Sequence, residues 1–268
     1  MKVERVCFAV SAGEGRTDAV TGVLKVPSEF KKRQSPAVIL AHGAGGGFDD
    51  PALSYVQSFL VGRGFVTLCF NFPYREKERK VPDRERVLEA TIRSAIRFLG
   101  EHPRYAPGQL FIGGKSMGGR MASNLLAADS TLASGLILLA YPLHAPGRPD
   151  RVRDQHLSSI AVPTLFVSGT RDALAPVPSL NAALARVSQA QIVWVDGADH
   201  SFNMLRKSGK TAEDVWNDLA VAVAGWLETV RNDPIRQHPP EPGEGDWERI
   251  PAGETAFSVD PSEIDRLG

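Results

Sequence analysis

Apolar and polar positions alternate along this chain in two different periods. Short apolar runs of the kind that form buried strands occupy 37–42, 65–70, 110–113, 135–140, 162–168 and 191–195. Between them, apolar residues recur every three or four positions, as on a helix with one buried face, over 51–63, 84–100, 117–128, 178–187 and 211–230. Strands that alternate with helices predict an α/β fold with a mostly parallel sheet and helices on both faces.

The first and last parts of the chain depart from this pattern. Segments 3–10 and 19–26 alternate apolar and polar residues around a turn-rich 11–18, which predicts an antiparallel hairpin. Segment 71–83 is polar and carries prolines, so we expect a loop there. Segment 232–268 has nine acidic residues, three arginines and six prolines. We therefore divide the chain into a folded domain, 1–231, and an acidic, proline-rich tail, 232–268.

Composition narrows the functional class. Across 268 residues the formal net charge is zero, which argues against a dedicated nucleic-acid-binding protein. The longest apolar stretch, 135–143, is too short to cross a bilayer, and the first residues show no signal-peptide pattern. The two cysteines, Cys7 and Cys69, do not suggest a disulfide framework. We expect a cytoplasmic protein with no membrane contact and leave its oligomeric state open.

One serine stands where a strand meets a helix. The sequence Gly114-Lys-Ser116-Met-Gly118 fits the Gly-x-Ser-x-Gly turn that exposes a nucleophilic serine at the end of a strand. Glycine is expected at these two positions because the backbone of neighbouring segments approaches closely and leaves no room for a side chain. The N–H of Met117, at the start of the following helix, is then a candidate donor to a substrate oxyanion.

A serine hydroxyl needs a base, and the base needs an orienting carboxylate. In this kind of fold the chain order is serine, acid, histidine. Asp172 follows the strand at 162–168, and His200 follows the strand at 191–195. Asp196 and Asp199 are rival carboxylates on the loop of His200 itself, and we favour Asp172 because Asp199 is too close in sequence to reach the far ring nitrogen.

A second oxyanion donor is expected from the glycine-rich stretch 43–47. We choose the N–H of Ala44, with Gly45 beside it as a pocket residue. This stretch matches no phosphate-binding motif. Among the histidines, His42 is interpreted as bracing the loop and His144 as a candidate for lining the substrate pocket. His102, in a polar, proline-bearing loop, is expected to be solvated.

The sequence resembles the α/β-hydrolases, and more narrowly a branch of bacterial proteins similar to dienelactone hydrolases. This branch also includes the hydrolase-like domain of a subunit of the non-specific-lethal histone acetyltransferase complex. The matching segments cover about 36–227 and read LAHGAGGG, FNFPYRE, GGKSMGGRMA, LAYPLHAPGRPD, VPTLFVSGTRD and GADHSF. The resemblance implies an eight-stranded sheet with Ser116, Asp172 and His200 as a catalytic triad. Dienelactone hydrolases use cysteine as nucleophile, so the serine here argues against dienelactone as substrate.

The segment between the strands at 135–140 and 162–168 is about twenty residues long and holds three prolines. It is too short for a large helical cap, so we expect an open site bordered by 141–161 and 73–82. We expect a serine hydrolase that cleaves a carboxylic ester or thioester of a small molecule through an acyl-enzyme, with no metal or cofactor. A peptidase or acyltransferase with the same triad, and a non-catalytic binding module, stay open as alternatives.

Overall fold

A computed structural model describes residues 1–11 and 17–232. Its centre is an eight-stranded sheet in the order β1-β2-β4-β3-β5-β6-β7-β8. The strands from β4 to β8 run parallel, whereas β1 pairs with β2, and β2 with β4, in antiparallel fashion. The strands are β1 Lys2–Ser11, β2 Thr17–Val26, β3 Pro36–Ala41, β4 Val66–Phe70, β5 Gln109–Lys115, β6 Leu136–Leu139, β7 Thr164–Gly169 and β8 Ala190–Val195. The predicted hairpin and the mostly parallel sheet are confirmed.

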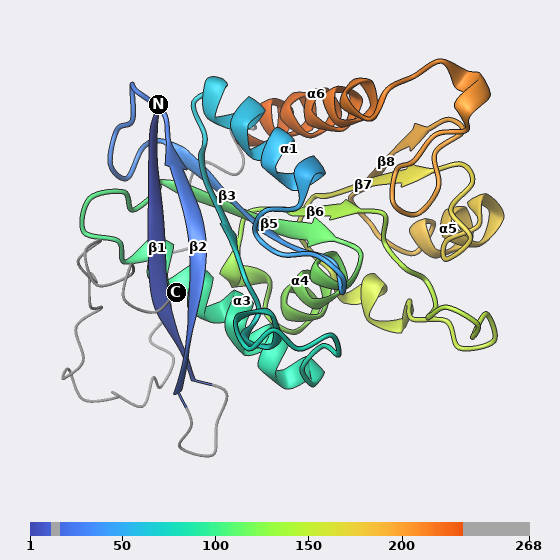
Figure 1. The fold of residues 1–268 in the computed structure, drawn as a ribbon, viewed down its shortest axis with the longest axis horizontal. Helices are drawn as coiled ribbons and strands as arrows, with labels where there is room; N and C mark the ends of the chain where they lie inside the picture. Colours follow the sequence, from blue (N-terminus) through green and yellow to red (C-terminus); the bar gives the residue numbers. More distant parts are fainter. Residues whose placement is uncertain (12–16, 233–268) are drawn as a thin grey trace.

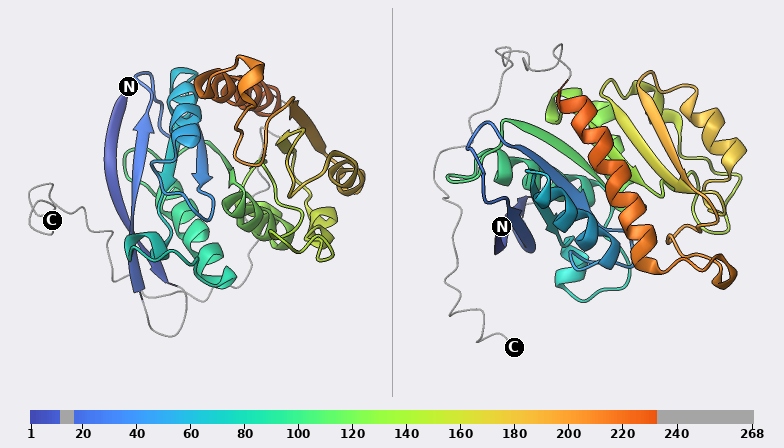
Figure 2. Two further views of the ribbon diagram at one scale, coloured as in Figure 1. Left: turned by 45° about the vertical axis from the view of Figure 1, so that its right-hand side comes forward. Right: turned by 90° about the horizontal axis from the view of Figure 1, so that it is seen from above.

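Helices cover both faces of the sheet (Figures 1 and 2). One face carries α1 and α6, and the other carries α3, α4 and α5. Because side chains alternate along a strand, β3 contributes to both cores: Val38 and Leu40 pack toward α1 and α6, and Ile39 toward α3 and α4. The helices are α1 Pro51–Gly62, α3 Glu85–Gly100, α4 Met117–Ala128, α5 Val177–Leu184 and α6 Ala212–Arg231.

The expectation of a plain loop at 71–83 is wrong in one respect. A one-turn helix, α2 (Pro73–Glu76), begins with a proline at its first turn, where a missing N–H costs nothing. Asp83 accepts a hydrogen bond from the N–H of Tyr74 at 2.7 Å, and the Tyr74 ring is fully buried. The buried Tyr74 ring anchors this stretch, and its last two residues, Pro82 and Asp83, line the cavity described below.

The chain between β6 and β7 forms no α-helix. It contains only a short 3-10 helix, η2 (Gln155–Ser159), so no large cap lies over the carboxyl ends of the strands. At the other end of the described chain, Thr211 begins α6 with a capping box to Asp214. The predicted tail, 232–268, falls outside the described residues beyond its first position. No helix among the described residues is long and apolar enough to span a membrane.

Candidate active site

Ser116 occupies a strained turn between β5 and α4. Its φ of 51° and ψ of −115° lie in a region that non-glycine residues rarely adopt. A Cβ on Gly114 would sit 2.2 Å from the Ala41 carbonyl oxygen, and one on Gly118 would sit 2.4 Å from the same atom. The backbone of β3 therefore presses against both glycines, which explains why the turn carries glycine on both sides of its serine.

Three side chains from three loops form one hydrogen-bonded chain. The Ser116 Oγ lies 2.9 Å from His200 Nε2, and His200 Nδ1 lies 2.8 Å from Asp172 Oδ2. Asp172 follows β7 and His200 follows β8, so the parallel strands deliver all three residues to the same edge of the sheet. The second Asp172 oxygen accepts the N–H of Leu174 at 2.8 Å, and the carboxylate is buried. Both oxygens are thus fixed, which orients the ring of His200.

The rival carboxylates are engaged elsewhere. Asp199 Oδ1 accepts the N–H groups of Ser201 and Asn203, each at 2.9 Å. Asp196 accepts the hydroxyl of Thr170 at 3.1 Å. Asp199 therefore shapes the loop that carries His200, while Asp172 is the carboxylate that meets the imidazole.

The glycine-rich loop after β3 is held by a pair of buried rings. Tyr74 donates its hydroxyl to the Ala44 carbonyl oxygen at 2.6 Å, and His42 Nδ1 lies 2.7 Å from the Gly43 carbonyl oxygen. The other nitrogen of His42 accepts the N–H of Phe72 at 3.2 Å. Burial lowers the pKa of His42 to about 4, so the ring is neutral near pH 7. Because Nε2 accepts from Phe72, the single ring proton is on Nδ1, which donates to the Gly43 carbonyl. This geometry fits the bracing role expected for His42.

A cavity of about 700 Å³ gathers the candidate residues. Ser116, His200, Ala44, Gly45, Met117 and His144 all line it, while Asp172 lies behind His200. Met117 is the first residue of α4, where an N–H has no acceptor within the helix. The walls include Arg120, Arg153 and residues from two further segments, Pro82, Asp83, Arg84 and Glu85, and Pro142, His144, Ala145 and Pro146. The second segment belongs to the expected border 141–161, whereas only Pro82 belongs to the expected border 73–82.

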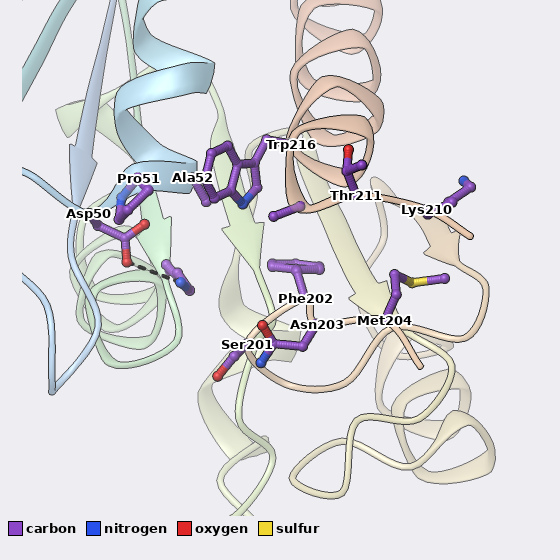
Figure 3. Close-up of a pocket in the computed structure, with 12 residues that line it drawn as sticks. Asp50, Pro51, Ala52, Ser201, Phe202, Asn203, Met204, Lys210, Thr211 and Trp216 are labelled. Atoms are coloured by element: carbon purple, nitrogen blue, oxygen red, sulfur yellow. Dashed lines mark hydrogen bonds and ion pairs between the residues drawn. The ribbon is translucent and has the colours of Figure 1, made fainter. Parts of the chain in front are cut away.

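A smaller cavity of about 400 Å³ adjoins this site (Figure 3). The two share Asp50, Lys115 and Ser201, and the ion pair between Lys115 Nζ and Asp50 Oδ2, at 3.0 Å, lies between them. Figure 3 shows Trp216, Phe202 and Met204 around the smaller cavity. The smaller cavity therefore borders the larger one at the same edge of the sheet.

Some residues of the site lack a visible signal in the sequence. Tyr74 stands in a stretch that its neighbours mark as polar, and Arg153 belongs to a loop with four other charged residues between 148 and 154. Arg120 could have been noted, because it follows Ser116 by one helical turn. The prediction for His102 is wrong: its ring is buried, stacks on Tyr105 at 5.0 Å, and accepts the N–H of that residue at 3.2 Å.

No group of three or more His, Cys, Asp or Glu side chains within residues 1–11 and 17–232 is arranged to hold a metal ion. The arrangement that these residues do present is a serine, an imidazole and a carboxylate in sequence, beside backbone N–H groups at a helix start. Such an arrangement can activate a hydroxyl and stabilise a negatively charged oxygen.

A family model described as an alpha/beta hydrolase domain matches residues 34–228. The chain therefore belongs to the α/β-hydrolase family. A Mycobacterium tuberculosis protein provisionally named a phosphoribosyl transferase is 31% identical over 186 residues, which are 68% of this chain and 39% of that protein. The chain thus spans about two fifths of the length of this curated relative.

Solved structures share the fold at low sequence identity. A dienelactone hydrolase from Anabaena variabilis superposes with a TM-score of 0.67 at 21% identity, covering 85% of this chain and 99% of its own. The esterase domain of a Rhodothermus marinus protein gives a TM-score of 0.63 at 14% identity, covering 85% of this chain and 99% of its own. The match to both is a match of fold.

Proposed function

We propose that this protein is a serine hydrolase that cleaves a carboxylic ester or thioester of a small molecule through an acyl-enzyme. One observation carries the proposal: Asp172, His200 and Ser116 form a continuous chain with separations of 2.8 and 2.9 Å, and the serine faces a cavity. Membership of the α/β-hydrolase family supports it, because that family places its reacting serine at this turn.

In this mechanism, Ser116 Oγ attacks the substrate carbonyl carbon while His200 Nε2 accepts the hydroxyl proton. The new C–O bond forms as the carbonyl π electrons move onto oxygen. Collapse of the tetrahedral intermediate breaks the bond to the leaving alkoxide or thiolate, which takes the proton from His200. Water then attacks the acyl-enzyme with His200 as base, and the acid product and free Ser116 result.

Two further roles belong to this proposal. The Asp172 carboxylate accepts the Nδ1–H of His200, which keeps Nε2 free to receive the serine proton and stabilises the imidazolium that follows. The N–H groups of Met117 and Ala44 donate to the oxyanion, which is worth roughly 3–4 kcal/mol per donor in comparable sites. The strained backbone of Ser116 supports its role as the nucleophile, because this conformation holds the hydroxyl out of the helix that follows.

No specific observation in the structure favours the other candidate functions. Peptide and acyl-transfer chemistry would use the same three side chains, and a binding module would have no need for their alignment. The phosphoribosyl transferase name belongs to a protein of which this chain matches 39%, so we do not extend it to this chain.

The direct test is turnover of a panel of ethyl esters and acyl thioesters by the wild-type chain and by Ser116→Ala. We expect hydrolysis by the wild type and a loss of at least about 10³-fold in the variant. Ser123→Ala is a matched control, because Ser123 also lies 2.8 Å from a histidine nitrogen, in His156, but is fully buried in α4. Equal rates for wild type and Ser116→Ala would overturn the proposal.

A further inference from the structure

A second feature of the large cavity is a pair of arginines beside the serine. Arg120 lies on α4 one turn after Ser116 and accounts for part of the cavity wall. Residues four apart on a helix have Cβ atoms about 5–6 Å apart, so the Arg120 side chain starts close to the reacting hydroxyl. Its side chain is only 12% exposed. Most of the cost of removing this charge from water is therefore already incurred in the folded chain.

The guanidinium of Arg120 is incompletely paired. One terminal nitrogen donates to Glu85 Oε1 at 2.6 Å, where α3 begins. Its Nε is buried and has no hydrogen-bond acceptor within the described part of the chain. A buried charged donor without an acceptor is costly, so this guanidinium retains hydrogen-bonding capacity that the described residues do not use.

Arg153 comes to the same wall from the loop between β6 and β7. The backbone fixes it from both sides: its N–H donates to the Leu143 carbonyl at 2.6 Å, and its carbonyl accepts the Tyr141 hydroxyl at 2.6 Å. Across residues 1–11 and 17–232, its guanidinium has no hydrogen bond or ion pair. Burial, and then the positive charge of Arg120, lower the pKa of Arg153. The two arginines are thus close enough to repel each other.

The carboxylates around the two arginines already have cationic partners: Glu85 pairs with Arg120, and Asp83, which also lines the cavity, pairs with Arg79. The hydrogen bond from Arg120, together with the charges of Arg120 and Arg153, lowers the pKa of Glu85. The Glu85 side chain is 59% exposed, so water competes for its carboxylate and another anion can take its place on Arg120. Asp154, whose side chain is 17% exposed, is paired with Arg186. His156 loses positive charge because burial lowers its pKa.

We infer that Arg120 and Arg153 form an anion-binding subsite, and that the substrate is an ester or thioester carrying a second group that is anionic, a carboxylate or a phosphate. This inference rests on the proposed function for the reaction itself. Guanidinium groups bind both anions through paired N–H donors. The spacing of one helical turn from Ser116 places the anion a few bonds away from the carbonyl that is attacked.

The subsite is tested with two esters of equal carbon number in the acyl part, monoethyl succinate and ethyl butyrate, by following ethanol release. We expect the wild type to prefer the anionic ester by at least tenfold in kcat/KM. Arg153→Gln should reduce that preference at least tenfold, and Arg153→Lys should restore part of it. Glu85→Gln should raise the preference, because it removes the competing carboxylate. Arg151→Gln, an exposed arginine on the same loop that does not line the cavity, is the matched control and should leave the preference unchanged.

A wild type without preference, or an Arg153→Gln variant that keeps it, would overturn the inference. Failure to hydrolyse either ester would count against the proposed function instead. Calorimetric titration of Ser116→Ala with succinate and with inorganic phosphate examines the subsite without turnover. Binding that disappears when Arg153→Gln is added supports the subsite, and the tighter of the two anions identifies its chemistry. If neither anion binds to Ser116→Ala, the inference is overturned.

Discussion

The carboxylate of Asp172 meets the ring of His200 at 2.8 Å, although 28 positions separate the two residues. Asp199, the residue just before His200, turns its carboxylate back onto the N–H groups of its own loop. The contact with Asp172 depends on the parallel pairing of β7 and β8. Both strands end at the same edge of the sheet, so the loop with Asp172 and the loop with His200 begin side by side. The sheet, and not proximity in sequence, decides which carboxylate meets the His200 ring.

Replacement of Asp172 by Asn should lower kcat roughly 10³–10⁴-fold, because an amide can donate to Nδ1 and stabilise the wrong imidazole tautomer. Asp199→Asn is the matched variant and should cost less than about tenfold. Steady-state kinetics on an ester that the wild type hydrolyses will show which of the two variants loses more kcat. A larger loss in Asp199→Asn would transfer the orienting role to that residue.

The hydroxyl of Tyr74 should matter for rate more than for binding. Tyr74→Phe removes the 2.6 Å hydrogen bond that holds the Ala44 carbonyl, so the adjacent N–H groups of the loop lose their fixed direction. We expect kcat to fall about tenfold with KM changed less than about twofold, as for partial loss of an oxyanion donor. Tyr55→Phe, whose exposed hydroxyl contacts Asn217 at 3.4 Å, should match wild type. An equal effect of both changes would argue against a role for Tyr74.

The serine turn should not tolerate a side chain at Gly118. A Cβ there would lie 2.4 Å from the Ala41 oxygen and 2.7 Å from the His42 oxygen, and both are backbone atoms that cannot move away. Gly118→Ala should therefore lower the unfolding free energy by about 3 kcal/mol or more. Gly62→Ala, at the end of α1 with no atom within 4 Å, should be neutral or stabilise by up to about 1 kcal/mol. Urea unfolding of both variants measures this, and equal stability would contradict the crowding.

Stability should decline as the pH falls from about 6.5 toward 4, because the pKa of His42 is about 4 in the folded chain and about 6.5 when unfolded. In that window the unfolded chain binds the proton and the folded chain does not, so the unfolding free energy drops with falling pH. The His42 contribution between pH 7 and pH 5 is about 2 kcal/mol. Urea unfolding at both pH values should show a smaller drop in His42→Asn. The same drop in both proteins would assign the acid sensitivity to other groups.

Much of the fold was accessible from the sequence because its signals are local. Apolar runs marked the strands, and Gly-x-Ser-x-Gly placed Ser116 at a strand-to-helix turn, as the structure has it. Tyr74 was not accessible, because its hydroxyl bonds to the Ala44 carbonyl, 30 positions away in the chain. His102 is buried against the nearby rings of Phe98 and Tyr105, which the charged residues beside it in the sequence conceal. Arg153 is similar: only the packing of its loop against α4 brings it to the cavity that contains Ser116.

The central claim is that Ser116 is an activated nucleophile, and covalent labelling tests it most directly. The purified chain is treated with a fluorophosphonate, which forms a bond to a serine oxygen with loss of fluoride, and the modified peptide is located by mass spectrometry. We predict a single adduct on Ser116 in the wild type and in Ser123→Ala, no adduct in Ser116→Ala, and labelling slowed at least about 100-fold in His200→Ala. A folded wild type that gains no adduct, or gains it on another serine, would contradict the account.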